Sequence, residues 1–154
     1  MKTQYIPFFL ILIGLLSACQ PEGASASPVT GTINQEVNLA PGQSVAVANT
    51  DLTVTFQAIV SDERCPSDVE CAASGPVTIS LSVQQGDGAS TDFTLQTFTD
   101  QNGRSPNVQF EGVTNRAEVG DYLIQVLRVT PYPKNLPTKI DPSEYRIGLL
   151  VSNK

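Results

Sequence analysis

Two stretches in which apolar and polar residues alternate constrain the fold of this chain more than any other feature. They span residues 52–60 (LTVTFQAIV) and 77–83 (VTISLSV). Successive side chains of a β-strand point to opposite faces of its sheet, so this alternation places one face of each strand against a core. The two stretches therefore predict the central pair of strands of a β-domain.

The polar segment between these strands contains two of the three cysteines, Cys65 and Cys71. Two cysteines in a polar loop between two strong strands predict a local disulfide. Such a bridge would stabilise the fold by about 2 kcal/mol and hold residues 66–70 in one shape. We call residues 64–75 the clasped loop. It is either a staple between strands, as most disulfides in secreted domains are, or a rigid recognition loop.

Seven residues in and beside the clasped loop form a pattern: Asp62, Arg64, Cys65, Pro66, Val69, Cys71 and Gly75. The pattern resembles a motif of small bacterial secreted and lipid-anchored proteins, mostly uncharacterised. Their motif is Asp-Ser-Arg-Cys-Pro, a short gap, Val-x-Cys, and then x-Trp-Ala-Gly leading into a strand. This chain departs from it at Glu63, which replaces the serine, and at Ala73, which replaces the tryptophan. The resemblance implies a β-sandwich-like domain outside the cytoplasm, and it implies no reaction.

Residues 1–18 have the pattern of a bacterial lipoprotein signal peptide. Lys2 supplies a positive charge, residues 6–16 are apolar, and the small residues before Cys19 resemble the lipobox. The apolar run falls short of the roughly twenty residues that span a bilayer. We expect cleavage before Cys19 and acylation of the Cys19 thiol. The acyl chains would anchor the protein to the bacterial cell envelope, with its domain outside the cytoplasm. The alternative is an ordinary signal peptide cut near the same place.

We expect residues 19–32 to form a flexible tether, because they are small, polar and rich in Pro, Ser and Gly. Residues 33–154 suffice for one core and are too few for two domains. No helical period lasts three turns, and residues 115–120 are expected to be a polar loop. The result is an all-β domain, an antiparallel β-sandwich that is immunoglobulin-like or similar. The expected strands are 36–39, 44–47, 52–60, 77–83, 92–97, 107–110, 122–129 and 145–151.

The charged residues exclude several classes of function. The chain has 9 basic residues, 15 acidic residues and no histidine, so its net charge is −6. Signal cleavage would remove one of the basic residues, Lys2, and make the chain more acidic. An acidic domain binds nucleic acid and anionic headgroups poorly, so acyl chains on Cys19 would have to hold it at the membrane. Without histidine, Ser-His and Cys-His catalysis and histidine metal sites are excluded. We expect no cofactor and no metal.

The acidic residues still offer two candidate cation sites. Asp100, Asn102 and Gly103 resemble part of a calcium loop, but the later acidic ligand is missing and all three are turn formers, so we favour a plain turn. Four carboxylates near the clasped loop either share a cation, or one of them pairs with Arg64, which we favour. They are Asp62, Glu63, Asp68 and Glu70.

These features favour a non-enzymatic binding or structural module at the cell envelope, whose partner is an envelope protein or a small ligand. The candidate contacts lie on two stiff loops. Arg64 and Pro66 belong to the clasped loop, while Tyr132 and Leu136 belong to residues 131–142, which we call the proline-rich loop. The alternative role of Tyr132 and Leu136 is to cover the open end of the core. Two other functions stay open: a carboxylate-dependent envelope hydrolase, and an inhibitor-like protein whose clasped loop enters a protease.

Overall fold

The computed structural model describes residues 28–135 and 139–154, which form nine strands and one short 3₁₀ turn. No helix in these two ranges is long and apolar enough to cross a membrane. The strands are β1 (Val29–Gly31), β2 (Val37–Leu39), β3 (Ser44–Val47), β4 (Leu52–Asp62), β5 (Val77–Gln85), β6 (Thr91–Thr97), β7 (Arg116–Val119), β8 (Tyr122–Thr130) and β9 (Arg146–Asn153), and the turn η1 is Pro142–Glu144.

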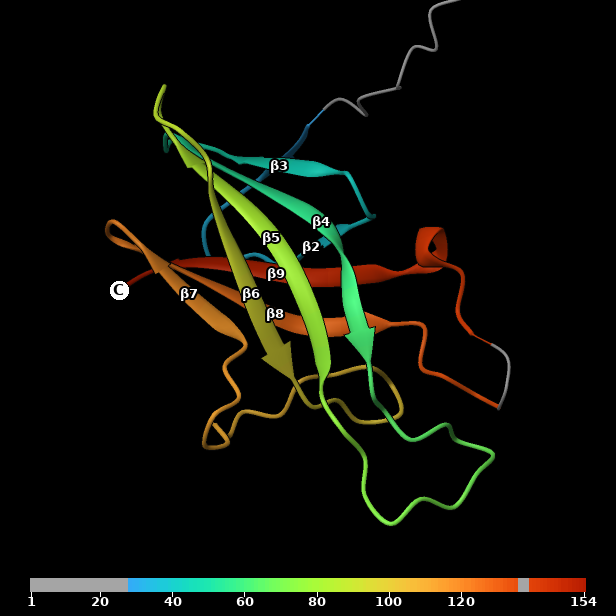
Figure 1. Cartoon of the computed structure of the whole chain (residues 1–154). Coiled ribbons are helices and arrows are strands. Elements are labelled where there is room, and N and C mark those ends of the chain that lie inside the picture. The colour runs from blue at the N-terminus through green and yellow to red at the C-terminus, as the bar shows by residue number, and fades with distance from the viewer. Residues whose placement is uncertain (1–27, 136–138) are drawn as a thin grey trace, which may run out of the picture.

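The strands form two sheets, in the orders β1-β3-β4-β5-β6 and β2-β9-β8-β7. In Figure 1 the strands of the first sheet cross over those of the second. Every strand pair is antiparallel except β1–β3, which is parallel. The prediction of an all-β, antiparallel sandwich is confirmed, with one parallel pair at an edge.

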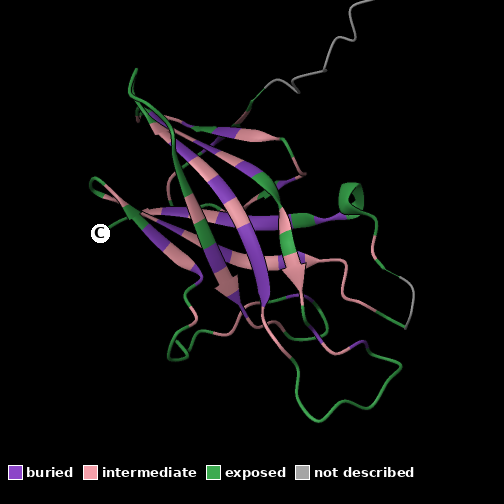
Figure 2. Ribbon diagram, viewed as in Figure 1, coloured by how far each residue is buried: buried purple, intermediate pink, exposed green. Residues whose placement is uncertain are grey.

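A single cluster of buried apolar residues lies between the two sheets, and both sheets contribute to it. The alternation predicted for residues 77–83 is confirmed except at Thr78. The apolar residues of β5 are at most 2% exposed and its two serines are half-buried, whereas Thr78 is also buried (Figure 2). The buried apolar residues of this strand are Val77, Ile79, Leu81 and Val83.

In β4 the alternation holds only for the first half of the strand. Beyond it, Val60 is 63% exposed, although the pattern places this side chain in the core. The pairing of β4 with β5 shifts register between Phe56 and Ala58 and again between Ile59 and Ser61. Each such bulge adds an unpaired residue, which moves the following side chains to the other face.

Two other expected segments are wrong. Residues 107–110 form only an isolated bridge at Phe110, and residues 115–120 contain β7 instead of a loop. Residues 107–110 alternate, but no strand of the described part of the chain pairs with them, and Val108 is 63% exposed. β7 is a short edge strand that buries little besides Ala117, so its apolar pattern is weak.

The domain also begins earlier than expected. β1 lies inside the expected tether of residues 19–32, where Gly31 is buried and pairs with β3. A Cβ atom on Gly31 would come within 2.7 Å of Val45, so glycine permits this close contact between strands. The strand is held by backbone pairing at a small residue, and composition alone does not indicate that. Residues 1–27, including Cys19, lie outside the described ranges.

Candidate functional site

Two loops that are far apart in the sequence meet at one end of the sandwich (Figure 1). The clasped loop connects β4 to β5, and the proline-rich loop follows β8. The backbone N–H of Ser67 donates to the carbonyl of Pro133 at 3.0 Å, and that of Asp68 donates to the carbonyl of Lys134 at 2.9 Å. We call residues 64–75 and 131–135 together the loop pair.

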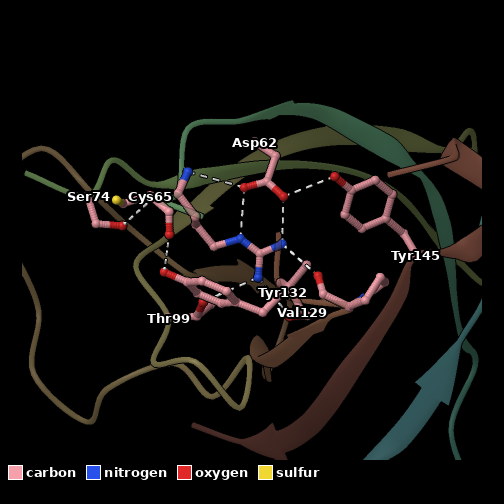
Figure 3. A network of polar contacts seen from close by, with 9 residues as sticks. Asp62, Cys65, Ser74, Thr99, Val129, Tyr132 and Tyr145 are labelled. Carbon is pink, nitrogen blue, oxygen red and sulfur yellow. Dashed lines mark hydrogen bonds and ion pairs between the residues drawn. The ribbon is translucent and has the colours of Figure 1, made fainter. Parts of the chain in front are cut away.

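The guanidinium group of Arg64 connects the two loops. The Arg64 side chain is 0% exposed. Its Nε and Nη2 donate to the two carboxylate oxygens of Asp62 at 2.7 and 2.6 Å. Nη1 donates to the carbonyl of Val129 at 3.0 Å and to the hydroxyl of Thr99 at 3.3 Å, and Nη2 also donates to the carbonyl of Pro131 at 2.9 Å (Figure 3). All five N–H donors of the guanidinium therefore have acceptors.

The carboxylate of Asp62 is equally well matched. It accepts from the backbone N–H of Arg64 at 3.2 Å and from the hydroxyl of Tyr145 at 2.9 Å. Burial alone would raise the pKa of Asp62, but the hydrogen bonds and charge of Arg64, with the Tyr145 hydroxyl, hold that pKa below its usual value. Burial, followed by the charge of Asp62, raises the pKa of Tyr145 to about 12. The prediction that a nearby carboxylate pairs with Arg64 is confirmed.

Tyr132 closes over this ion pair. Its hydroxyl donates to the carbonyl of Cys65 at 2.8 Å, and the Arg64 Cζ lies 5.0 Å from the centre of its ring, within the range of a cation–π contact. Of the four candidate contact residues, Arg64 and Pro66 are buried and Tyr132 is half-buried. The fourth, Leu136, lies outside the described residues. Arg64 and Tyr132 thus hold the loop pair together, while Pro66 is buried within the clasped loop.

The disulfide between Cys65 and Cys71 is present, as predicted. Beyond it, residues 67–73 are exposed (Figure 2). The base of the loop is tight, because a Cβ atom on Gly75 would lie 2.7 Å from the Cβ of Glu63. Glycine at this position therefore lets the two ends of the loop pack together.

A cleft of about 460 Å³ opens beside the ion pair, between the C-terminal half of β4 and the chain that leads into β9. Its lining residues are Ile59, Val60, Ser61, Asp62, Arg64, Pro66, Pro133, Asn135, Lys139, Ile140 and Tyr145. A more open hollow of about 590 Å³ lies beside Phe98 and Arg104 and contains no residue of the loop pair.

The segment around Asp100 is a turn, as we favoured. One carboxylate oxygen of Asp100 accepts from the backbone N–H groups of Asn102 at 2.9 Å and of Arg104 at 2.8 Å, and Gly103 has a φ of 76°. Within residues 28–135 and 139–154, no group of three or more His, Cys, Asp or Glu side chains is placed to hold a metal ion.

Sequence reasoning missed several members of the network around Arg64. Tyr145 was expected only as the start of the last strand, and Thr99 was not singled out. The spacing of Asp62 and Arg64 within the motif was the one available signal, since the other acceptors lie 35 to 67 residues away in the chain.

No protein-family model matches this chain, and comparisons with curated proteins and with solved structures find no match either.

Proposed function

We propose that this protein is a non-enzymatic binding module that acyl chains on Cys19 hold at the bacterial cell envelope. It recognises an envelope protein or a small ligand through the exposed surface of the loop pair. One observation supports this function above all. Loops from distant parts of the chain are joined into one unit, through the buried Arg64 and two backbone hydrogen bonds.

Joining the loops before binding has a thermodynamic consequence. A flexible loop loses conformational freedom when it binds, at a cost of about 0.5–1.5 kcal/mol for each side chain that becomes immobile. Here the disulfide, the Tyr132 hydroxyl and the Arg64 guanidinium already restrict the clasped loop. Exposed residues at its tip can therefore contact a partner with a smaller entropic cost.

The position of the loop pair also suits a tethered binder. Figure 1 places the first described residues, beginning at Pro28, on the opposite side of the domain from the clasped loop. The chain between Cys19 and Pro28 can extend about 30 Å at most. With a lipid anchor on Cys19, the loop pair would face away from the membrane and toward partners in the envelope.

The two other hypotheses receive less support. A carboxylate-dependent hydrolase needs a carboxyl group with a raised pKa, whereas the carboxyl beside the cleft, Asp62, has a lowered one. An inhibitor that enters a protease needs an extended loop, whereas the N–H of Val69 donates to the carbonyl of Pro66 at 3.2 Å and closes a turn.

A pull-down of the tagged full-length protein from cross-linked envelopes tests the binding function. The test variant is Asp68→Lys with Glu70→Lys, which reverses two exposed charges at the loop tip and keeps its backbone. The matched control is Asp87→Lys with Asp121→Lys, which reverses two exposed charges in turns at the opposite end. We expect the test variant to lose most of the captured partner and the control to keep it. Equal capture by both variants, or no specific capture by the natural chain, would refute the proposal.

A further inference from the structure

We propose that the outer edge of β4, residues 57–62, pairs with an extended apolar peptide segment that carries a carboxylate. The inference rests on the proposed binding function, and it adds a second contact surface and a class of partner. In this binding mode a peptide adds one strand to an existing sheet, so that main-chain hydrogen bonds provide affinity and side-chain pockets provide selectivity.

Within residues 28–135 and 139–154, no strand pairs with the outer edge of β4 over half its length. β3 pairs with β4 only as far as Thr55, and the turn before β3 adds two hydrogen bonds that end at Phe56. From there β4 continues to Asp62 with β5 on its other side. Among the described residues, no backbone hydrogen bond reaches residues 57–62 from the outer side. Such an edge is a template for pairing with another chain.

The cleft of about 460 Å³ runs along this edge and indicates what would bind there. Ile59 and Ile140 are half-buried in its wall, and Val60 on the edge is 63% exposed. Lys139 is exposed and forms no ion pair within the described part of the chain. Since Arg64 neutralises Asp62, the unmatched charge of the cleft is positive. Apolar side chains with a nearby carboxylate complement this lining.

The shape of the edge favours a flexible peptide over a second copy of the domain. The two bulges of β4 lie between Phe56 and Ser61, within the open part of the edge. Bulges bend and twist a strand, and they are a device that prevents two folded sheets from joining edge to edge. A free peptide can follow the bend. Six residues of β4 span about 20 Å, which matches a peptide of five or six residues.

Binding can be measured with fluorescein-labelled hexapeptides and the full chain purified in detergent. The probes are Lys-Thr-Val-Thr-Val-Val with a free carboxyl terminus, the same peptide amidated, and the amidated peptide with Glu at its fifth position. Fluorescence polarisation gives the affinity, and hydrogen–deuterium exchange locates the contact. We expect protection of residues 57–62 and none of β6, an edge strand of the same sheet. A free terminus and a side-chain carboxylate are distinguished by the second and third probes.

Matched variants test the two contacts. Val60→Asp should weaken binding at least tenfold, whereas Val108→Asp, which is equally exposed at 63%, should leave it unchanged. Lys139→Ala should weaken binding of a carboxylate probe about two- to fivefold and should not affect the amidated peptide, with Lys154→Ala, which removes an exposed lysine outside both loops, as the control. If Val60→Asp loses its native circular dichroism spectrum, Val60→Thr removes the apolar contact while keeping a β-branched side chain, and it should also weaken binding.

The edge proposal is overturned if no probe protects residues 57–62, or if Val108→Asp weakens binding as much as Val60→Asp does. It also fails if Val60→Asp keeps the envelope partner that the loop-tip variant loses, and in that case the proposed function stands. Conversely, protection of residues 57–62 by a probe, with no partner captured from envelopes by the natural chain, would support the edge and count against the proposed function.

Discussion

Replacing Arg64 by alanine should destabilise the domain more than any surface substitution. The side chain is 0% exposed, and its loss leaves the Asp62 carboxylate with only the Tyr145 hydroxyl and one backbone N–H as donors. Two carbonyls, those of Val129 and Pro131, lose a buried donor at the same time. Removing one partner of a buried ion pair costs about 3–5 kcal/mol. This is a large share of the roughly 5–15 kcal/mol by which domains are stable.

Urea unfolding followed by circular dichroism measures this loss by linear extrapolation. Arg128→Ala is the matched control, because Arg128 contacts Glu36 at 3.3 Å with a side chain that is 32% exposed, so its loss should cost at most about 1 kcal/mol. Arg64→Lys keeps the charge but lacks the planar guanidinium group. Its loss in the free energy of unfolding should therefore lie between those of Arg128→Ala and Arg64→Ala. If Arg64→Ala costs no more than Arg128→Ala, the ion pair does not hold the loops, and the account of the site is wrong.

Of four further predictions, two concern pH dependence, one the disulfide and one the anchor. The pKa of Tyr145 is raised to about 12 in the folded chain, so its contribution to stability is complete below pH 10 and is lost as the pH rises through 12; Tyr145→Phe should flatten that decline in the free energy of unfolding. The pKa of Asp62 is lowered, so its contribution is present above about pH 4 and is lost at more acid pH; Asp62→Asn should show less acid dependence there. Cys65→Ser with Cys71→Ser should cost about 2 kcal/mol and leave the fold intact, whereas alkylation of both thiols in native, non-reduced protein would disprove the bridge. Cys19→Ser should move the protein to the aqueous phase in a detergent partition, and recovery of an unmodified thiol on Cys19 would disprove the anchor.

Part of this architecture could be predicted because it depends on local pattern. β5 alternates in the sequence and, apart from the buried Thr78, in its burial, since it is a regular strand with neighbours on both sides. The pairing of Cys65 with Cys71 and the pairing of Asp62 with Arg64 join residues only 6 and 2 positions apart. Such pairs need only a local turn of the chain to meet.

The rest depends on contacts that the pattern does not encode. The bulges of β4 arise from its register with β5, so the exposure of Val60 does not follow from the residues around it. The acceptors of Arg64 in β8 and on the proline-rich loop are main-chain carbonyls, which every residue has. Tyr145 reaches Asp62 across 83 positions of sequence, and only the packing of the two sheets brings them together.

The claim that the two loops form one unit is tested most directly by hydrogen exchange at two amides, those of Ser67 and Asp68. Both residues are exposed, yet their N–H groups donate to the carbonyls of Pro133 and Lys134. Glu70, which is also exposed and whose N–H has no backbone acceptor among the described residues, provides the comparison. If the two loops form one unit, the Ser67 and Asp68 amides exchange much more slowly than that of Glu70 in the natural chain, and Arg64→Ala abolishes the difference. Exchange of all three amides at the same fast rate in the natural chain would contradict this claim.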